Sequence, residues 1–371
     1  MENKNYFFFI TCLEAGGAQR ALIQLIEHIR SIESSSKIYV VNLSKGGEEL
    51  ETIILNNTDK LFNLDLKNFS FKKIINVFKF IKLNRNYSIL VGWMYHAGLL
   101  AWLLSIFSSK MKLIFSIHHS GVDSKNLSIR TLFIVYLLGL ISYSKRVKNI
   151  VFCAESSFAA HLKAGYPKNK SKVIFNGVDT SKISLKDDPT EKNIFKIVMA
   201  ARFDPIKNHE NLFIALTNLN KKLPFSLSLY GENIDVNNRI LIDLINKYEL
   251  AEILKIEGVD PQLREKFNNY DLLVLPSNSE AFPLVIPEAM LCGVPCIASS
   301  VGDIPNIIGN YGWLVPPKDP NELSQALENA YKLWIYDEGW KELRNNCRKR
   351  IEENFSSNRF CERYYDCMSS M

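Results

Sequence analysis

The stretch from Asp271 to Ala298, DLLVLPSNSEAFPLVIPEAMLCGVPCIA, constrains the fold of this chain more than any other. Its first apolar run, Leu272 to Leu275, ends at Pro276 and is typical of a strand that is buried on both faces in a parallel sheet. A second apolar run ends at Ala298. Because open α/β sheets bind ligands beyond the carboxyl ends of their strands, the polar loop after Leu275 is a predicted ligand site.

Two carboxylates flank the backbone of this loop. Glu280 lies in the loop itself, and Glu288 follows Pro287, which suits the first turn of a helix. The N–H groups between Ala281 and Ile286, together with the helix start, can face an anion. A glutamate near a helix N-terminus is also stabilised by the helix dipole alone, and a loop glutamate is commonly solvated. The pattern by itself therefore leaves a binding role and a structural role open.

The string SEAFPLVIPEAMLCGVPCIAS resembles the signature of the retaining glycosyltransferases of family 4, or glycosyl transferases group 1. In that signature a Glu, seven residues and a second Glu precede Ala-Met-x-x-Gly-x-Pro-x-Ile-Ala. The resemblance implies that Glu280 faces the donor sugar and that Glu288 accepts hydrogen bonds from the ribose. It also places four intervening residues in the donor site: Phe282, Pro283, Leu284 and Val285. Ala281 stands where the family more often has Gly, which predicts a stiffer or differently turned loop.

Apolar runs at intervals along the chain predict a strand-and-helix alternation that stops at a polar stretch, Thr180 to Asn193, and then restarts. We expect strands at Tyr6–Ile10, Lys37–Asn42, Ser88–Gly92, Lys112–Ile117 and Asn149–Cys153, and, after the polar stretch, at Phe195–Ala201, Leu227–Tyr230, Ile253–Gly258, Leu272–Leu275, Pro295–Ser299 and Gly312–Val315. We also expect a helix capped by Ser156 and a tight turn at Asn176 to Asp179, which resembles the family's Asn-Gly-Val-Asp turn.

Two segments of the first half are candidate ligand sites. Gly16 and Gly17 separate the first strand from a helix, so that backbone amides can approach a phosphate, although glycines also simply form turns. The segment is similar to the family's Gly-Gly-Ala-Glu-Arg, with Gln19 in place of the Glu. His118 and His119 follow the strand Lys112–Ile117. The resemblance implies that the first of the pair contacts the donor sugar, so His118 is our choice and His119 the reserve.

In the second half, Arg202 and Lys207 follow the strand Phe195–Ala201. An Arg fork and a mobile Lys charge at a strand exit suit a diphosphate, whereas two solvated cations are the commoner outcome for these residue types. The resemblance favours the diphosphate, because the family places its phosphate-binding Arg and Lys here. Gly231 lies in the turn after Leu227–Tyr230, near which the family holds the nucleotide base.

The composition is that of an ordinary globular protein, with 47% apolar and 23% charged residues. Its 371 residues are enough for about two to three domains. The formal charge of +6 suits anionic substrates or an anionic membrane surface, and no Arg-rich tract with interleaved aromatics points to nucleic acid. Seven scattered cysteines without a C-x-x-C pair are typical of reduced thiols in a cytoplasmic protein, so we expect no metal ligation by cysteine.

Three further segments bear on membranes. The apolar runs Gly98–Phe107 and Leu132–Ile141 each have about half of the ~20 residues needed to span a bilayer, so we expect buried or interfacial helices. Residues 71–85 alternate apolar positions with Lys72, Lys73, Lys79, Lys82 and Arg85. This basic amphipathic helix could lie on the inner face of the plasma membrane. A helix packed on the core with a solvated lysine face explains the same pattern, and both interpretations remain open.

The fold that the resemblance implies is GT-B: two Rossmann-like, doubly wound α/β domains that face each other across a cleft. We expect an acceptor-binding domain at residues 1–186, onto which a C-terminal helix at 357–371 packs back, and a domain for the nucleotide sugar at residues 187–356. The linker would lie within Thr180 to Asn193.

The implied activity is transfer of a hexosyl or N-acetylhexosaminyl group, with retention, from a nucleotide diphosphate sugar, foremost a UDP-sugar. The acceptor would be a glycan or lipid-linked glycan, in the synthesis of a bacterial surface polysaccharide. The expected catalytic residues are Glu280, His118, Arg202 and Lys207. No metal or cofactor is expected, since no Asp-x-Asp donor motif occurs. A GT-B epimerase of nucleotide sugars and a non-catalytic sugar-phosphate binding module are the alternatives, and the length disfavours a phosphorylase.

Overall fold

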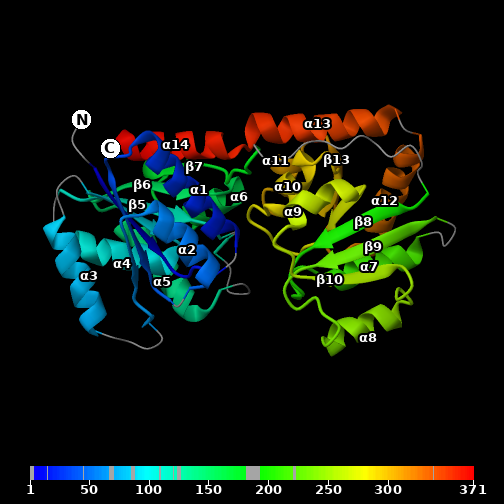
Figure 1. Ribbon diagram of the computed structural model, residues 1–371, viewed down its shortest axis with the longest axis horizontal. Helices are drawn as coiled ribbons and strands as arrows, with labels where there is room; N and C mark the ends of the chain where they lie inside the picture. The colour runs from blue at the N-terminus through cyan, green and yellow to red at the C-terminus, as the bar shows by residue number, and fades with distance from the viewer. Residues whose placement is uncertain are drawn as a thin grey trace. The chain divides into compact units, whose positions relative to one another are not determined.

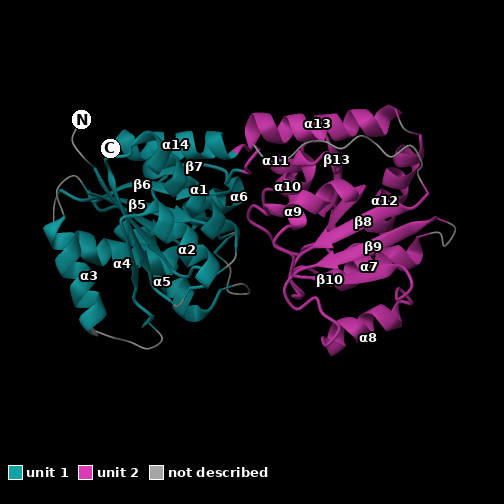
Figure 2. Ribbon diagram, in the orientation of Figure 1, with its two compact units in different colours: residues 1–177, 357–371 teal, residues 178–356 magenta. Residues whose placement is uncertain are grey.

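The computed structural model describes residues 4–14, 16–44, 46–66, 71–84, 88–107, 110–119, 121–122, 127–180, 193–219, 223–336 and 338–371 (Figure 1). The chain forms two compact units (Figure 2). Unit 1 comprises residues 1–177 and 357–371, and unit 2 comprises residues 178–356.

Unit 1 is built on a parallel sheet with the strand order β3-β2-β1-β4-β5-β6-β7. Its strands are β1 (Asn5–Ile10), β2 (Lys37–Asn42), β3 (Lys60–Asn63), β4 (Ser88–Trp93), β5 (Lys112–Ile117), β6 (Val147–Phe152) and β7 (Ser171–Val173). Its helices are α1 (Gly17–Ile32), α2 (Glu48–Asn57), α3 (Phe71–Leu83), α4 (Tyr95–Ser105), α5 (Ile129–Ile141), α6 (Glu155–Lys163) and α14 (Ser357–Ser369).

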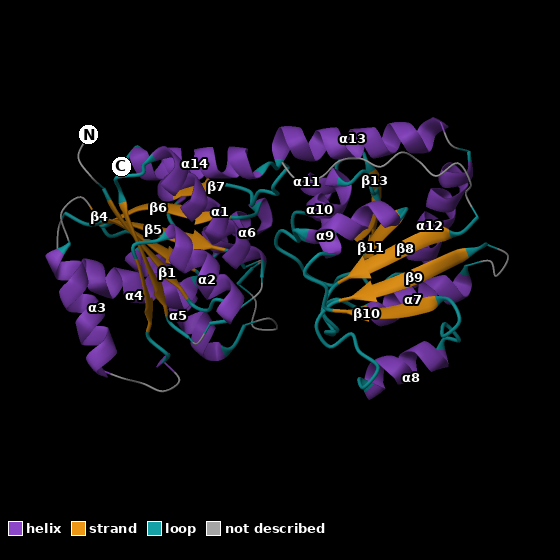
Figure 3. Ribbon diagram, viewed as in Figure 1, coloured by secondary structure: helices purple, strands orange, loops and turns teal. Residues whose placement is uncertain are grey.

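Helices cover both faces of this sheet because its strands are apolar on both faces (Figure 3). In β1, Phe7 and Phe9 join the core on the side of α3, α4 and α5. Tyr6, Phe8 and Ile10 join the core on the side of α1 and α14. The C-terminal helix α14 therefore belongs to unit 1, where it packs on α1.

Unit 2 repeats this architecture with the order β10-β9-β8-β11-β12-β13, and again neighbouring strands are parallel. The strands are β8 (Phe195–Ala200), β9 (Phe225–Tyr230), β10 (Leu254–Gly258), β11 (Leu272–Leu275), β12 (Cys296–Ser299) and β13 (Gly312–Val315). The helices are α7 (His209–Asn218), α8 (Arg239–Lys247), α9 (Leu263–Lys266), α10 (Val285–Leu291), α11 (Ile304–Ile308), α12 (Pro320–Ile335) and α13 (Glu338–Asn354).

All the strands predicted from the sequence are present, and β2, β5, β11 and β13 have the predicted bounds. Pro287 and Glu288 lie in the first turn of α10, as predicted, but two other local expectations are wrong. Ser156 does not cap α6, which starts at Glu155 after Ala154 and has no side-chain cap. Residues 176–179 do not turn, because Val178 bridges to Ser356 and its N–H bonds to the Phe355 carbonyl oxygen at 2.8 Å.

That pairing explains where the units divide. Val178 is tied to Phe355 and Ser356, so the division lies between Gly177 and Val178, earlier than the expected boundary at 186. The expected linker, Thr180 to Asn193, lies outside the described residues except for its two ends, and so does Arg85 of the predicted basic helix.

The two apolar runs that raised the question of a membrane span lie in α4 and α5. Neither of them, nor any other helix in the described part of the chain, has the length and apolarity needed to cross a bilayer. Six of the seven cysteines are buried and Cys12 is half-buried, all as free thiols.

Candidate functional site

The strand order of each unit contains one topological switch point. In unit 1 the chain builds outward from β1 to β3 and then returns to place β4 on the other side of β1. In unit 2 the same switch occurs between β8 and β11. Loops that leave adjacent strands in opposite directions open a crevice at the carboxyl edge of the sheet, where α/β proteins bind ligands. The predicted site residues follow β1 and β5 in unit 1, and β8, β9 and β11 in unit 2.

In unit 2, the loop after β8 is fixed by Asp204. Its Oδ1 accepts a hydrogen bond from the Ile206 N–H at 2.8 Å, and its carbonyl oxygen accepts one from the Lys207 N–H at 2.9 Å. Asn208 then adopts a left-handed conformation, with φ +54°, and α7 begins at the next residue. Asn tolerates this conformation better than most residues. The loop is therefore a defined turn that presents Lys207.

The loop after β11 is tied to this turn by Asn278. The Asn278 N–H donates to the Ile206 carbonyl oxygen at 2.7 Å, and its Nδ2 donates to the Pro205 carbonyl oxygen at 3.1 Å. Asn208 Nδ2 in turn donates to Asn278 Oδ1 at 3.1 Å. Two segments about seventy residues apart in sequence thus form one hydrogen-bonded unit at the switch point.

This arrangement brings Lys207 and Glu280 together. Lys207 Nζ lies 2.5 Å from Glu280 Oε1, and Ser277 Oγ donates to the same oxygen at 2.8 Å. The two side chains are only 20% and 10% exposed. A poorly solvated ion pair at the end of a parallel sheet gives the site a positive and a negative group held in fixed positions.

Two glycines, Gly302 and Gly231, allow neighbouring backbone segments to pack closely at this edge of the unit 2 sheet. Gly302 has φ +56°, and a Cβ at this position would lie 2.0 Å from the Glu280 carbonyl oxygen. The next residue, Asp303, donates its N–H to the Ala281 carbonyl oxygen at 3.0 Å. The turn at Gly302 and Asp303 therefore packs against the backbone of the Glu280 loop and holds it in place. Gly231 has φ +142°, and a Cβ there would lie 2.3 Å from the Ala201 carbonyl oxygen, beside Arg202. Glycine at 231 therefore lets the turn after β9 pack against the backbone at the exit of β8.

The other predicted residues of unit 2 lie in the same two loops or at the start of α10. Arg202 is 56% exposed at the exit of β8, with its Nε 3.4 Å from Asp204 Oδ2. Phe282 and Pro283 are buried, and the Phe282 ring packs on Phe355 at 5.6 Å between centroids. Leu284, Val285 and Glu288 are half-buried at the start of α10.

In unit 1, α1 begins at Gly17, directly after the switch-point strand β1. Gly16 is extended, and a Cβ there would lie 2.6 Å from Gln19 Oε1. Gln19 Nε2 donates back to the Cys12 carbonyl oxygen at 3.3 Å. The Gln19 side chain thus links the start of α1 to the loop after β1 and packs against Gly16. Ala15, within this loop, lies outside the described residues.

His118 lies at the end of β5, with its ring stacked on Trp93 at 4.6 Å between centroids. Its Nε2 shares a hydrogen bond with Ser116 Oγ at 2.9 Å, and Trp93 Nε1 donates to the Ala18 carbonyl oxygen at 2.9 Å. Nδ1 is buried and has no hydrogen-bond partner in the described part of the chain. Burial, with a smaller effect of His119, lowers the pKa of His118 to about 3, so the imidazole is neutral at neutral pH.

His119 points to different neighbours. Its ring stacks on Tyr95, 5.0 Å away and nearly parallel, and burial lowers its pKa as well. The sequence predicted both histidines, but not Trp93, Ser116, Ser277 or Asn278, which hold the predicted residues in place. Ser277 and Asn278 immediately precede the signature string, which begins at Ser279, so their closeness in sequence to Glu280 was the signal that could have found them.

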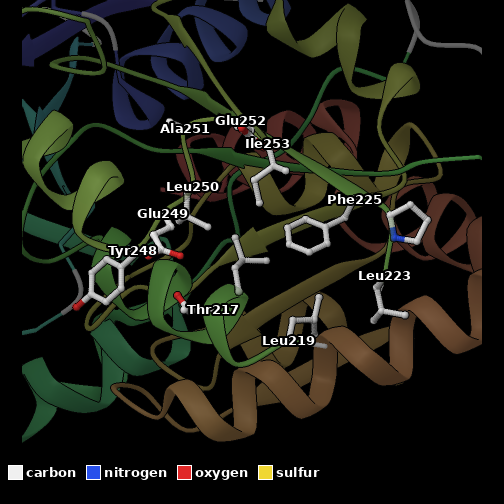
Figure 4. A pocket seen from close by; sticks show the side chains of 12 residues that line it. Thr217, Leu219, Leu223, Phe225, Tyr248, Glu249, Leu250, Ala251, Glu252 and Ile253 are labelled. Atoms are coloured by element: carbon white, nitrogen blue, oxygen red, sulfur yellow. The ribbon is translucent and has the colours of Figure 1, made fainter. Parts of the chain in front are cut away.

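A separate hollow of about 640 Å³ lies at the opposite, amino edge of the unit 2 sheet (Figure 4). Leu219, Phe225, Tyr248, Leu250 and Ile253 are among its lining residues, which precede or begin strands rather than follow them. It is distinct from the switch point. Among the described residues, no group of three His, Cys, Asp or Glu side chains is arranged to hold a metal ion.

Comparisons with known proteins agree with this geometry. Residues 15–182 match the model of Glycosyltransferase Family 4, and residues 182–354 match that of Glycosyl transferases group 1. The chain is 27% identical over 229 residues to an uncharacterized 41.2 kDa protein in the cps region of Klebsiella pneumoniae, a match that covers 58% of each chain. It is 26% identical over 205 residues to WcaL, a putative colanic acid biosynthesis glycosyltransferase of Escherichia coli K12, covering 52% of this chain and 50% of WcaL.

These matches span only about half of the length of the curated relatives. The fold match is more extensive. The crystal structure of Anabaena HepE in complex with UDP-glucose superposes with a TM-score of 0.80 and covers 99% of this chain and 100% of that one, at 18% identity. The fold of both units is therefore that of the GT-B glycosyltransferases.

Proposed function

Because the chain belongs to the family 4, group 1 glycosyltransferases, we propose that it transfers a sugar from a nucleotide diphosphate donor, foremost a UDP-sugar, to a hydroxyl of a glycan or lipid-linked glycan. The observation that carries this proposal is the Lys207–Glu280 pair at the switch point of unit 2. The UDP-glucose in the structure of HepE supports the choice of donor class.

The charge of the reaction explains why such a pair is useful. Breaking the anomeric C–O bond leaves negative charge on the diphosphate and positive charge on the sugar. We assign Lys207 and Arg202 to the diphosphate, and the carboxylate of Glu280 to the sugar and its neighbouring hydroxyls. A preorganised charged group in a poorly solvated site stabilises a transition state more than water does, typically by ~2.7–4 kcal/mol for one donor.

The predicted donor-binding groups of unit 1 carry no charge. The amide of Gly17 at the start of α1 is suited to a phosphate oxygen. A neutral His118 offers Nδ1 to a sugar hydroxyl without adding a cation beside the developing positive charge. Glu288, near the start of α10, is assigned to the ribose.

We further propose that the sugar is transferred with retention and without a divalent metal. The departing diphosphate would take the proton of the acceptor hydroxyl on the same face of the sugar, so the reaction needs no separate general base. Whether the group is hexosyl or N-acetylhexosaminyl depends on the contacts of the donor C2 substituent.

The relatives support a role in bacterial surface polysaccharide synthesis, since one is encoded in a cps region and another is a putative colanic acid glycosyltransferase. A lipid-linked acceptor would place the protein at the inner face of the plasma membrane. Lys72, Lys73, Lys79 and Lys82 of α3 are exposed, whereas Val77 and Ile81 are buried in the core. The helix thus combines core packing with a basic outer face, and we propose peripheral contact of that face with anionic lipid.

A screen of UDP-, GDP- and dTDP-sugars tests the donor assignment. We expect one donor class to raise the melting temperature and to release nucleoside diphosphate, in the presence of a chelator as in its absence. The anomeric configuration of the product, determined by NMR, tests retention. No stabilisation by any nucleotide sugar would contradict the proposal.

The same assay separates the alternatives. An epimerase would convert the donor to an isomer without releasing nucleoside diphosphate. A binding module would be stabilised by the donor but would leave it intact when acceptors are added.

A further inference from the structure

Helix α5 has an outer face that is apolar and uncovered. Ile129, Phe133, Tyr136 and Leu140 are 85%, 69%, 53% and 73% exposed, and Tyr143, just beyond the helix, is 64% exposed. These positions are spaced four, three, four and three residues apart, so they form a single stripe along the helix.

The exposure of this stripe is not caused by a loosely placed helix. On the opposite side of α5, Val135, Leu138 and Ile141 are buried in the core of unit 1. Tyr166 Oη donates to the Val135 carbonyl oxygen at 2.8 Å, and the Tyr166 ring packs against Gly139. The helix is therefore anchored, and its outer residues are free to meet another surface.

The apolar surface continues onto the end of α4. Arg146, in the turn after α5, donates from Nη1 to the Ser105 carbonyl oxygen at 2.9 Å and from Nη2 to the Ile106 carbonyl oxygen at 3.2 Å. This places the end of the stripe beside Ile106 and Phe107, which are 43% and 57% exposed. The Phe107 ring contacts Phe78 of α3 at 4.5 Å, so the basic helix α3 adjoins the same surface.

The part of the sequence that carries this surface is strongly basic. Between Phe71 and Cys153 the sequence contains twelve Lys and Arg residues and one acidic residue, Asp123. Since the whole chain carries only +6, the remainder is net negative. Arg130 and Lys145 flank the stripe and are exposed, as are the four lysines of α3. Aromatic and aliphatic side chains with a cationic border are the composition of surfaces that enter the headgroup region of an anionic bilayer.

We propose that the stripe Ile129, Phe133, Tyr136, Leu140 and Tyr143, together with Ile106 and Phe107, inserts into an anionic membrane surface. This deepens the peripheral contact in the proposed function: the α3 lysines attract the protein to the lipid, and the stripe holds it there. A second copy of the chain fits less well, because two such faces would bring like charges together.

Sedimentation of the full chain with vesicles tests this assignment, and needs no knowledge of donor or acceptor. We expect the protein to bind vesicles of equal parts phosphatidylglycerol and phosphatidylcholine, and not vesicles of phosphatidylcholine alone. The double variant Phe133→Ser, Leu140→Ser should reduce binding at least about tenfold, since two large side chains no longer enter the lipid. The matched control is Val236→Ser, Ile240→Ser in unit 2, where the wild-type residues are 71% and 67% exposed, and it should bind as wild type.

A single Phe133→Trp variant gives a second readout. Its fluorescence should shift to shorter wavelength when anionic vesicles are added, because the new indole leaves water. Circular dichroism and the melting temperature would show that each variant is folded. Binding of the Phe133, Leu140 double variant equal to wild type would overturn the proposal, as would failure of the wild type to bind anionic vesicles.

The remaining outcomes are equally decisive. A concentration-dependent dimer that is lost in the double variant, without vesicle binding, would assign the face to a second copy and overturn the proposal. If vesicles bind as expected but no nucleotide sugar is turned over, the proposed transferase function fails while the membrane surface stands.

Discussion

The two units share one architecture but hold their predicted site residues in different ways. In unit 2 the switch point contains charged groups in direct contact, with Lys207, Glu280 and Ser277 joined within hydrogen-bond distance. In unit 1 it contains stacked rings, with His118 on Trp93 and His119 on Tyr95, and burial keeps both imidazoles neutral at neutral pH. On the proposed function, the difference leads us to expect that unit 2 supplies the charged groups of the reaction and that unit 1 supplies neutral hydrogen bonds.

The largest expected effect comes from removing the cation of the unit 2 pair. Lys207→Ala should lower kcat by about 10²–10³, equivalent to ~2.7–4 kcal/mol, because a preorganised charge facing the leaving diphosphate is lost. Steady-state kinetics with the identified donor measures this. Lys247→Ala is the matched control, because it removes a surface ion pair with Glu210, 2.9 Å apart and 59% exposed at the lysine. An equal loss of kcat in both variants would contradict the assignment of Lys207 to the site.

The next effect concerns the backbone that supports Glu280. Gly302→Ala should lower the free energy of unfolding by about 2–3 kcal/mol, since it adds strain at positive φ to a clash with the Glu280 carbonyl oxygen. Gly165→Ala in unit 1, at φ +93° with nothing within 4 Å of the added Cβ, should cost about 1–2 kcal/mol. Urea unfolding compares the two. A smaller loss of unfolding free energy at Gly302 than at Gly165 would show that the Glu280 loop moves to accommodate the added Cβ.

Acid should weaken both units. Burial lowers the pKa of His161 in unit 1 and of His209 in unit 2 to about 4. His161 is held neutral between Ser157 and Tyr95, with its Nδ1 2.7 Å from the Ser157 carbonyl oxygen and its Nε2 2.8 Å from Tyr95 Oη.

Between the unfolded pKa of 6.5 and the folded value of about 4, the unfolded chain binds more protons, so stability falls as pH falls. Each histidine should contribute a loss of about 2 kcal/mol by pH ~5. Urea midpoints measured across this range should decrease, and His161→Gln and His209→Gln should each make the decrease shallower. An unchanged slope in both variants would exclude these histidines as its cause.

A smaller effect on activity is expected at the predicted site residues of unit 1. His118→Ala should lower kcat/KM by about tenfold, the loss expected for one neutral hydrogen bond to the donor. His119→Ala, whose ring is stacked on Tyr95, should change it less. Kinetics of the two variants decides between the predicted contact and its reserve, and a larger loss at His119 would reverse the assignment.

The smallest effect is expected at the position where the chain departs from the family signature. Ala281 is not among the non-glycine residues with positive φ, so alanine fits its backbone without strain. Ala281→Gly should therefore lower the free energy of unfolding by about 0.4–1 kcal/mol, through the greater freedom of the unfolded chain, with little change in kcat. A marked gain in activity would show that this loop limits turnover.

The sequence determined the elements that depend on local patterns. Continuous apolar runs predicted buried parallel strands such as β11, and the Glu280 signature predicted where a ligand loop would lie. Helices α2 and α8 were not predicted. The Ser156 cap was wrong because capping depends on which residue leaves the helical conformation first, and a single serine near a helix start does not fix that.

Only the tertiary structure decided the strand order, and with it the two switch points and the contact between Lys207 and Glu280. It also decided that one side of α5 is buried and the other exposed. Local periodicity cannot specify such features. Strand neighbours and solvent exposure depend on segments that are far apart in the chain and come into contact only in the folded protein. An apolar helix has the same sequence pattern whether a neighbour covers its outer face or not.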